Sequence, residues 1–407
     1  MGSLRLKQSK EEIMDAHDHR KLGAKLDLFH QQEDAPGTAF WHSKGAIICL
    51  LLESYIRSEM QRAGFLEVRT PQLMSRSLWE RSGHWSRFGD NMFVFEDGNR
   101  QYALKPMNCP GHVQLFKQQV RSYRDLPLRF NEFGVCHRYE PSGSLHGLKR
   151  VRAFTQDDAH VFCAPEHINN EVSRFCGLLR RVYRRLGFDD FKVGLSTRPD
   201  HREGSEESWD EAEATLAAAA RATGLSFRTQ PGDGAFYGPK LEFILTDCQG
   251  REWQCGTIQL DTVLPEKLDV NVVNGDGERV RPVMIHHAVL GSFERFVAIL
   301  LEHHRGRLPF WLAPEQVVIL PISDQQDEYA REVSDEFSSM GFRCIVDAAD
   351  ETLSRRIVSA RERLIPVFIV VGNREANDRS VSMRESDGNQ ITLSIEEAIS
   401  YLTRLEA

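Results

Sequence analysis

The chain has 407 residues, of which 41% are hydrophobic, 27% charged and 9% aromatic. This composition is typical of a globular protein and excludes a collagen-like or wholly disordered chain, and the length predicts about two to three domains. The 51 basic and 59 acidic residues give a formal net charge of −8. A nucleic acid would therefore have to bind local basic patches, because the chain as a whole is not basic.

The sequence gives no sign of a membrane or secreted protein. No apolar run approaches the roughly 20 residues needed to cross a bilayer, and the polar N-terminus lacks the apolar core of a secretory signal. The eight cysteines are dispersed without a CxxC pair. We therefore expect free thiols in a reducing compartment and a cytoplasmic protein.

The first part of the chain is predicted to contain two helices and a strand. A charge-rich helical pattern covers residues 4–29, and a loop follows as far as Ser43. Helical apolar spacing continues through 44–63, after which Gly64 supplies a left-handed stop. The segment FLEVRT alternates as a strand, which Pro71 ends or confines to a sheet edge.

Two pairs of strands are expected in the middle of the chain. Residues 128–140 and 151–162 alternate as the strands of a long hairpin. Residues 240–247 and 251–261 are predicted to form a second antiparallel pair.

Two helices are predicted between these pairs. The first begins near Pro165, carries apolar residues at helical spacing and ends at Gly187. The second is predicted to start at Ser208, with Glu211 completing a capping box, and to run to about Thr223.

The pattern changes after PFWLAP, which marks the clearest domain boundary. Strands and helices then alternate: EQVVILPI, a helix capped by Ser323, FRCIVDA, a helix over 353–364, IPVFIVVG and a final helix capped by Ser394. This order predicts a small α/β unit with a largely parallel sheet.

The strand VRAFTQDDAHVF is the most informative segment for function. Its period of two places five side chains on one face: Arg152, Phe154, Gln156, Asp158 and His160. A ring, an amide, a carboxylate and an imidazole in one row could stack a base, orient a polar substrate and bind a metal. The alternative is the solvated face of an edge strand, and this segment alone does not decide between the two.

An anion site is a candidate around the loop before this strand. Arg138 and Glu140 lie on one face just before the loop, and Arg150 follows it. Two guanidinium groups facing each other across a hairpin suit a bent triphosphate. Ion-paired arginines on a surface hairpin are the alternative and the commoner arrangement.

The residues resemble the class II aminoacyl-tRNA synthetases, most closely the threonyl-tRNA synthetases of that class, over nearly the whole chain. The helix, strand and proline ending at Pro71 resemble motif 1, HRYE with Arg150 and Phe154 resembles motif 2, and GSFERF at 291–296 resembles motif 3. Further strings shared with the family are DHRKLG, MNCPGH, EPSGSLHGL, FTQDDAH, GAFYGPK and WQCGT.

The resemblance implies an α/β protein of the α+β type. It predicts a linker helix over 1–30, a catalytic domain over 31–308 with an antiparallel sheet flanked by helices, and a small α/β anticodon-binding domain over 313–407. The implied activity is ligation of threonine to tRNA with ATP, with Mg²⁺ bound mostly through the phosphates. A homodimer paired across motif 1 is also implied.

The resemblance assigns roles residue by residue. The ATP-binding positions are Arg138, Glu140, Arg150, Phe154, Gln254, Thr257 and Arg295. Arg138 and Arg295 are also expected to be catalytic, as is His84, an imidazole expected to titrate near neutrality and to move the proton of the ribose 2′-hydroxyl. The threonine-binding positions are Met107, Gln156, Asp158, Tyr237 and Gln259. Because Gln254 and Thr257 have opposite strand parity, an irregularity is predicted at Gly256.

The resemblance also places one zinc ion in the amino-acid pocket, with Cys109, His160 and His286 as ligands. Sulfur and imidazole suit zinc, and three protein ligands leave coordination positions open. Threonine would offer its amino nitrogen and its hydroxyl, with Asp158 accepting the hydroxyl proton, whereas valine lacks the second ligand. Without the resemblance, these dispersed residues would be interpreted as a buried thiol and two ordinary histidines.

Two departures from the family bear on function. Full-length bacterial members usually carry an N-terminal module that hydrolyses seryl-tRNA, and we expect this chain to charge serine without clearing it. In the C-terminal unit, Ala349 and Asp350 stand where an arginine and an asparagine are expected near the anticodon, which predicts altered recognition, while Glu375 and Arg384 match anticodon-binding positions. A paralogue that passes the adenylate to another acceptor and a non-catalytic binding protein remain the alternatives.

Overall fold

The computed structural model describes residues 16–385 and 390–406. The chain divides into a larger unit, Gln31–Ala39 with Glu53–Ile299, and a smaller unit, Met1–His30 with Phe40–Leu52 and Leu300–Ala407. The described residues before His30 thus group with the C-terminal part, and the predicted division into 1–30, 31–308 and 313–407 stays a prediction.

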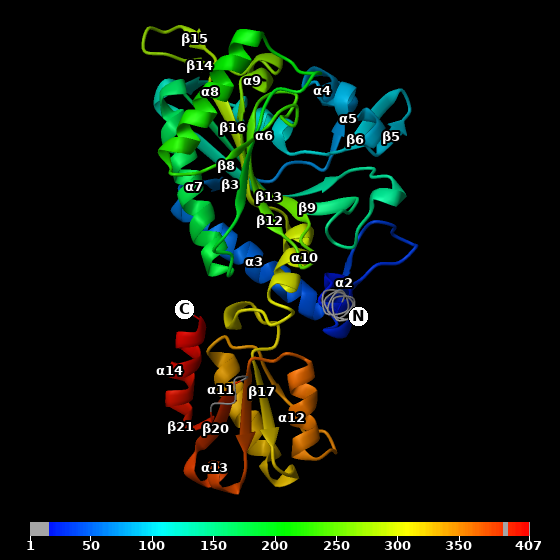
Figure 1. The fold of residues 1–407 in the computed structure, drawn as a ribbon, viewed down its shortest axis with the longest axis vertical. Coiled ribbons are helices and arrows are strands. Elements are labelled where there is room, and N and C mark those ends of the chain that lie inside the picture. The colour runs from blue at the N-terminus through cyan, green and yellow to red at the C-terminus, as the bar shows by residue number, and fades with distance from the viewer. Residues whose placement is uncertain (1–15, 386–389, 407) are drawn as a thin grey trace, which may run out of the picture. The chain divides into compact units, whose positions relative to one another are not determined.

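An eight-stranded sheet forms the centre of the larger unit (Figure 1). Its order is β11-β10-β12-β13-β16-β9-β8-β3, and its neighbours are antiparallel except for the parallel pairs β10 with β11 and β3 with β8. The strands are β3 (Leu66–Glu67), β8 (Leu128–His137), β9 (Ala153–Cys163), β10 (Lys192–Ser196), β11 (Arg228–Gln230), β12 (Lys240–Thr246), β13 (Glu252–Asp261) and β16 (Val283–Ser292). The predicted antiparallel sheet and both strand pairs are confirmed.

The strand predicted from FLEVRT is much shorter than expected. Only Leu66 and Glu67 pair, with Phe130 and Asn131 of β8 at the sheet edge. The prolyl nitrogen of Pro71 cannot donate to a ladder, and the chain leaves the sheet before reaching it. Helix α3 (Ser43–Arg62), which precedes this strand, ends as predicted, with Gly64 at a φ of 81°.

Helix α7 (Ile168–Arg185) covers one face of the sheet (Figure 1). The Phe175 ring contacts Phe243 of β12 with ring centres 5.7 Å apart, and Gly187 follows the helix at a φ of 85°. The apolar spacing of this helix therefore predicted the buried stripe correctly.

Helix α8 (Glu206–Ala222) packs beside α7 and begins earlier than expected. Its N-cap is Ser205, whose hydroxyl accepts the Ser208 N–H at 3.2 Å, so the predicted cap at Ser208 with Glu211 is wrong. Glu206 and Glu207 then occupy the first turn, where carboxylates are favoured by the helix dipole.

Smaller elements complete the larger unit. Two three-stranded sheets have the orders β4-β6-β5 and β15-β14-β7. Their strands are β4 (Leu73–Ser75), β5 (Val94–Asp97), β6 (Arg100–Leu104), β7 (Arg121–Ser122), β14 (Val272–Val273) and β15 (Arg279–Val280). The short helices are α4 (Arg76–Arg81), α5 (His84–Phe88), α6 (Cys109–Phe116) and α9 (Val263–Lys267), and α10 (Phe293–His303) follows β16.

The smaller unit contains a five-stranded sheet of order β18-β17-β19-β20-β21. Its strands are β17 (Val317–Pro321), β18 (Cys344–Val346), β19 (Val367–Val371), β20 (Ser380–Glu385) and β21 (Gln390–Ser394). Only β18, β17 and β19 are parallel, so the expected largely parallel sheet is incomplete. The short helix α13 (Asn373–Asp378) ends at Arg379 with a φ of 47°, and the chain returns antiparallel as β20 beside β19.

Apolar cores lie on both faces of this sheet. Helices α11 (Asp327–Ser339) and α14 (Ile395–Glu406) cover one face, and α12 (Leu353–Glu362) covers the other (Figure 1). The predicted capping box of α14 is confirmed, because the Ser394 N–H donates to Glu397 at 2.9 Å and the Glu397 N–H donates to Ser394 at 3.2 Å.

The N-terminal residues of the smaller unit form helix α2 (His19–Lys25) and a two-stranded sheet of β1 (Phe29–His30) and β2 (Phe40–Trp41). Of the helical pattern expected over 4–29, the structure describes helix α2 from His19 to Lys25, and residues 4–15 lie outside the described residues. Of the helices that the structure describes, none is both long and apolar enough to cross a membrane.

Candidate active site

One cavity of the larger unit brings together most of the predicted site residues. It has a volume of about 490 Å³. The predicted positions that line it are Met107, Arg138, Glu140, Arg150, Phe154, Gln156, Asp158, His160, Tyr237, Gln254, Thr257, Gln259, His286 and Arg295. Cys109 and His84 do not line it and are buried, and Glu375 and Arg384 belong to the smaller unit.

The sheet register explains how distant residues meet in this cavity. His286 of β16 lies opposite Gln259 of β13 on one side and His160 of β9 on the other. The row predicted on β9 is confirmed for Phe154, Gln156, Asp158 and His160, which all line the cavity. It is wrong for Arg152, which precedes β9 and donates to Glu140 O at 2.9 Å and Ser142 Oγ at 3.1 Å.

A β-bulge in β13 lets residues of opposite parity face the cavity. Phe243 of β12 pairs with Gly256, but the next residue, Ile244, pairs with Gln254, so Cys255 is the extra residue. Gln254 and Thr257 consequently both line the cavity, which confirms the irregularity predicted at Gly256. A Cβ on Gly256 would come within 2.5 Å of Leu179 Cδ1, so any larger residue there would force Leu179 to move.

Two buried polar groups hold the backbone around this bulge. The Tyr183 hydroxyl accepts the Gly256 N–H at 2.9 Å and donates to Val289 O at 3.0 Å. The carboxyl of Asp157, on β9, accepts the N–H groups of Val289, Leu290 and Gly291 of β16 at 2.8 to 2.9 Å. Burial raises the pKa of Asp157 to about 7 against these hydrogen bonds.

Three arginines lie at the end of the cavity near Phe154, away from His160. Arg138 lies over the Phe154 ring at 5.0 Å and donates to Pro106 O at 3.2 Å. Arg150 is paired with Glu140 at 2.8 Å. The predicted alternative of ion-paired arginines is therefore present, and this ion pair lines the cavity. The anion site stays a prediction.

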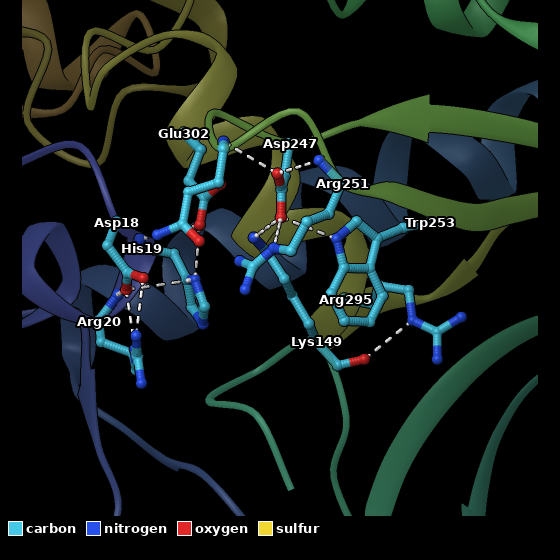
Figure 2. Close-up of polar contacts among 10 residues, drawn as sticks. Asp18, His19, Arg20, Lys149, Asp247, Arg251, Trp253, Arg295 and Glu302 are labelled. Atoms are coloured by element: carbon cyan, nitrogen blue, oxygen red, sulfur yellow. Dashed lines mark hydrogen bonds and ion pairs between the residues drawn. The ribbon is translucent and has the colours of Figure 1, made fainter. Parts of the chain in front are cut away.

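Arg295 is held by main-chain carbonyl groups. Its Nε donates to Lys149 O at 2.9 Å (Figure 2), and its Nη1 donates to Gln254 O at 2.9 Å. Burial lowers the pKa of Arg295, and the positive charge of Arg138 acts in the same direction. The guanidinium is thus fixed by neutral acceptors and keeps its charge for an anion in the cavity.

A possible metal site closes the other end of the cavity. The ligand atoms of Cys109, His160 and His286 all lie within 4.8 Å of one another, and all three residues are buried. His160 Nε2 and His286 Nδ1 are 3.0 Å apart.

The hydrogen bond of His286 to Asp261 fixes the proton on one ring nitrogen. Asp261 Oδ1 accepts the N–H groups of Val263 at 2.7 Å and Leu264 at 2.9 Å, and its Oδ2 lies 2.8 Å from His286 Nε2. A carboxylate oxygen only accepts, so Nε2 carries the proton. His286 Nδ1 therefore presents a lone pair.

A longer chain fixes the proton of His160. Glu132 accepts from Lys105 Nζ at 2.9 Å, from the N–H and hydroxyl of Thr70 at 2.9 and 2.8 Å, and from His112 Nε2 at 3.2 Å. His112 Nδ1 is then an acceptor and receives the proton of His160 Nδ1 at 2.7 Å. His160 Nε2 is left with a lone pair, and burial keeps the ring neutral by lowering its pKa well below the usual value.

The two hydrogen-bond chains thus point two nitrogen lone pairs at each other across 3.0 Å. Lone pairs at this distance repel unless a cation lies between them, and the nearby Cys109 sulfur adds a third donor. Sulfur with two imidazoles, each oriented by an outer hydrogen bond, is a donor set that suits zinc. The residues present therefore fit this metal.

A second group of possible ligands has a simpler explanation. Asp18, His19 and Glu302 of the smaller unit are buried together, but both oxygens of Asp18 accept from Arg20 at 2.8 to 2.9 Å (Figure 2). Asp18 is the N-cap of α2, and His19 Nδ1 lies 2.8 Å from Glu302. This cluster caps a helix.

Comparisons with known proteins identify the family of the chain. Residues 93–304 match the family described as the tRNA synthetase class II core domain (G, H, P, S and T), and residues 316–405 match the anticodon binding domain. A solved structure described as the RNA binding domain of threonyl-tRNA synthetase from Cryptosporidium parvum superimposes with a TM-score of 0.93 at 43% identity, over 95% of this chain and 98% of that chain. The chain belongs to the class II aminoacyl-tRNA synthetases.

Within the class, relatives at more than 50% identity are named threonine–tRNA ligase. The threonine–tRNA ligase of Teredinibacter turnerae is 52% identical over 392 residues, and that of Methylococcus capsulatus is 54% identical over 377 residues. These alignments cover 96% and 93% of this chain but only 62% and 59% of the relatives. The chain thus spans about six tenths of the length of these threonyl-tRNA synthetases.

His84 lies in a different environment from the one expected from other threonyl-tRNA synthetases. Its Nε2 is 3.4 Å from Cys109 Sγ and its Nδ1 is 2.9 Å from Ser82 Oγ. Burial and the nearby His286 lower the pKa of His84 to about 3. The prediction of an imidazole that titrates near neutrality is wrong for this fully buried ring.

The structure adds partners that sequence reasoning missed. Asp158 accepts from Asn108 Nδ2 at 3.0 Å, and the Tyr237 hydroxyl donates to Gln259 at 2.6 Å while its ring stacks on His286. Neither Asp261 nor His112 was predicted, because each acts through a histidine at least 25 residues away in sequence. Only the fold reveals such contacts.

The predicted anticodon residues lie in the smaller unit. Glu375 accepts the Gly372 N–H at 3.0 Å and so caps α13. Arg384 lies on β20 and donates to Gln390 of β21. Ala349 and Asp350 are exposed in the loop after β18.

Proposed function

We propose that this chain activates L-threonine with ATP to threonyl-adenylate and transfers it to the 3′ end of tRNA. The observation that carries the proposal is the convergence of Cys109, His160 and His286 at one end of a cavity whose other end holds three arginines. Relatives at 52 to 54% identity named threonine–tRNA ligase support it.

We propose Cys109, His160 and His286 as the ligands of one zinc ion. When bound, zinc would supply open coordination positions for the amino nitrogen and hydroxyl of threonine. Asp158 would accept the hydroxyl proton, with Asn108 holding its carboxylate in place at 3.0 Å. Because an apolar pocket alone separates such isosteres only about a hundredfold, this polar recognition is what would reject valine.

The remaining threonine-binding positions would shape the pocket. Met107, Gln156, Tyr237 and Gln259 line the same cavity. The hydrogen bond from Tyr237 to Gln259, at 2.6 Å, orients the Gln259 amide, and the stacked Tyr237 ring holds the plane of His286. These contacts favour one fixed orientation of the amino acid.

The ATP-binding residues would act through position and charge. Arg138 would hold the α-phosphate and Arg295 the γ-phosphate. Phe154 would stack on the adenine, and Glu140 would accept a hydrogen bond from the adenine amino group. Gln254 and Thr257 assist from the bulged strand, and Mg²⁺ would bind through phosphate oxygens. The carboxylate of threonine attacks the α-phosphate and pyrophosphate leaves, so no covalent enzyme intermediate is required.

We propose that His84 acts in the transfer step as a neutral imidazole. Its pKa of about 3 leaves the ring uncharged at neutral pH but makes it a weak base, so it would act by hydrogen bonding to the ribose 2′-hydroxyl. Its contact with Cys109 would hold the ring beside the amino-acid end of the cavity.

We propose a homodimer paired through motif 1. Leu66 on the edge strand β3 is 55% exposed, and Leu73 is 48% exposed. A sheet edge that carries exposed leucines is suited to pairing with a second chain. We also expect a cytoplasmic setting, which the eight free cysteines support.

The altered anticodon loop favours a second candidate function. The exposed carboxylate of Asp350 would repel phosphate where an amide would pair with a base. The alternative is therefore a paralogue that forms threonyl-adenylate but recognises tRNA differently or uses another acceptor. We also propose that this chain charges serine, which keeps both zinc-binding groups, without clearing the product.

Amino-acid-dependent exchange of pyrophosphate into ATP tests the first step. We expect exchange with threonine, weaker exchange with serine and almost none with valine. Charging of tRNA with the usual threonine anticodon and with altered anticodons then separates the two candidates. Equal exchange with threonine and valine would refute the proposed site, and exchange without charging of any tRNA would favour the alternative acceptor.

Retention of seryl-tRNA needs a separate assay. Seryl-tRNA made by this chain is incubated with fresh chain, and its decay is compared with decay in buffer. Faster decay with the chain present would contradict the proposal that it does not clear serine.

A further inference from the structure

A buried carboxylate outside the cavity connects three segments around Arg295. Asp247 lies in the turn between β12 and β13 and does not line the cavity. Figure 2 shows its side chain at the centre of a cluster with Lys149, Arg251 and Trp253. The Asp247 and Lys149 side chains are both 0% exposed.

The Asp247 carboxylate accepts five hydrogen bonds. Its Oδ1 accepts the N–H groups of Gln249 and Arg251, each at 2.9 Å, which closes the turn. Its Oδ2 accepts from Lys149 Nζ at 2.7 Å, Arg251 Nε at 2.7 Å and Trp253 Nε1 at 2.8 Å. These charged and polar donors hold the pKa of Asp247 well below its usual value in spite of burial.

The residues fixed by Asp247 are the ones that hold Arg295. Lys149 provides the carbonyl that accepts Arg295 Nε, and Gln254, the residue after Trp253, provides the carbonyl that accepts Arg295 Nη1. Asp247 thus binds the side chain of Lys149, whose carbonyl accepts Arg295 Nε. It also binds the side chain of Trp253, the residue before the carbonyl that accepts Arg295 Nη1. Lys149 also directly precedes Arg150, which lines the cavity.

The charge balance of the cluster gives Asp247 a second effect. Lys149, Arg251 and Arg295 all lie within 5.5 to 5.8 Å of the centre of the Trp253 ring. Without the Asp247 carboxylate, these cations would repel one another in a region of low dielectric. Loss of the carboxylate would therefore release Lys149 and shift the acceptors of Arg295.

We infer that Asp247 is a positioning residue for ATP binding, because it fixes the two carbonyl groups that orient Arg295. The inference rests on the proposed function only in taking ATP as the ligand of the cavity. Asp247 itself touches neither the cavity nor the reacting atoms.

The test is calorimetric binding of MgATP to the 407-residue chain and to Asp247→Asn. Asparagine keeps an oxygen for the turn but places an amide N–H₂ against the three side-chain donors. We expect the Kd for MgATP to rise about tenfold or more, as for loss of a charge-assisted contact, while the KM for threonine in pyrophosphate exchange changes less than about twofold. An unchanged Kd would overturn the inference.

Glu171→Gln is the matched structural control. It breaks the buried pair of Arg129 and Glu171, whose atoms are 2.6 and 2.8 Å apart, and neither residue lines the cavity. We expect its Tm to fall while its Kd for MgATP stays at the wild-type value. A rise in Kd equal to that of Asp247→Asn would show that loss of stability alone weakens binding, and would overturn the inference.

A double-mutant cycle with Arg295→Ala tests the route. If Asp247 acts through Arg295, Asp247→Asn changes the Kd less than about twofold in the Arg295→Ala background, because coupled residues are not additive. If Asp247→Asn raised the Kd for MgATP by the same factor in the wild-type and Arg295→Ala backgrounds, the inference would be overturned. Should Asp247→Asn fail to fold, Trp253→Phe removes a single donor and keeps an aromatic ring at that position, and an unchanged Kd for MgATP in that variant would overturn the inference equally.

Binding of MgATP requires neither threonine nor tRNA, so the two proposals fail separately. A wild-type chain that binds MgATP without threonine-dependent exchange would refute the proposed function and leave the role of Asp247 intact.

Discussion

The two central sheets bury their polar residues very differently. In the larger unit, Asp158, His160 and His286 are buried on strands of the sheet and face a cavity. In the smaller unit, both faces of the five-stranded sheet are covered by apolar cores, and the predicted anticodon contacts lie at a helix cap and near a hairpin. Substitutions in the sheet of the larger unit should therefore change activity strongly, whereas substitutions in the sheet of the smaller unit should change it only modestly.

The largest expected effect comes from removing a candidate zinc ligand. In Cys109→Ala, we expect zinc to fall from about one per chain to less than about a tenth, since only two donors remain. Threonine-dependent exchange should fall about 10³-fold or more. Elemental analysis and exchange kinetics measure both. The control is Cys163→Ala, a buried thiol outside the cavity, which should keep its zinc, and a zinc-loaded Cys109→Ala would contradict the assignment.

The next largest effect concerns Glu132, which is linked to His160 through hydrogen bonds of His112. Burial acts to raise the pKa of Glu132, but hydrogen bonds from His112, Lys105 and the Thr70 N–H outweigh it and lower the pKa from 4.5 to about 2. Because the folded-state pKa is the lower one, this group stabilises the fold fully above about pH 4.5, and that contribution, about 3 kcal/mol at 1.36 kcal/mol per pKa unit, is lost as the pH falls toward 2. Urea unfolding of wild type and Glu132→Gln should therefore show a difference in unfolding free energy that narrows on acidification.

The exposed pair of Arg76 and Glu80 provides a contrast for this measurement. Their side chains are 39% and 47% exposed, so Glu80→Gln should leave the unfolding curve close to wild type at every pH. A Glu132→Gln difference that stayed constant from pH 7 to pH 2 would mean that Glu132 is not ionised in the fold.

A smaller effect is expected from Asp261, which orients His286. Asp261→Asn weakens the acceptor of the His286 Nε2 proton, and loss of such an outer partner typically costs about 10- to 100-fold in metal affinity. Competition with a zinc chelator measures the change. Asp276→Asn, in an exposed turn, is the control, and equal zinc affinity in Asp261→Asn and wild type would remove Asp261 from the site.

The smallest effects belong to the second sheet. Arg384→Ala should raise the KM for tRNA about three- to tenfold by removing one cationic contact, and should leave threonine-dependent exchange unchanged. Asp350→Asn should lower the KM for tRNA, because it removes a carboxylate that repels phosphate. Charging kinetics test both. An effect of Arg384→Ala on exchange would show that the comparison between the two sheets is too simple.

Strand parity and turn chemistry were the parts of the fold that the sequence could predict. The cavity row of β9, the bulge beside Gly256 and the cap at Ser394 depend on neighbours within a few residues. The strands β20 and β21 were missed because the turn at Arg379 needs a positive φ that nothing in the local sequence announces.

The candidate site was only partly predictable for the same reason. Cys109, His160 and His286 came from a family resemblance, whereas their partners Asp261 and His112 required the register of the sheet. The environment of His84 could not be foreseen, because its burial depends on Phe236, which packs against the ring from a segment distant in sequence. These contacts join residues that are far apart in sequence, so the local sequence pattern could not predict them.

The extra residue in β13 divides that strand into two phases. On one side of Cys255, the even-numbered Gln254 faces the end of the cavity with the arginines, and on the other side the odd-numbered Thr257 and Gln259 lead toward His286. A one-residue shift of the strand register before the bulge would turn the Gln254 side chain away from the cavity. Thr257 and Gln259, beyond the bulge, would stay in place beside His286. The strand thus offers separate adjustment of the proposed nucleotide contacts and the proposed amino-acid contacts, although both are built on a single continuous backbone.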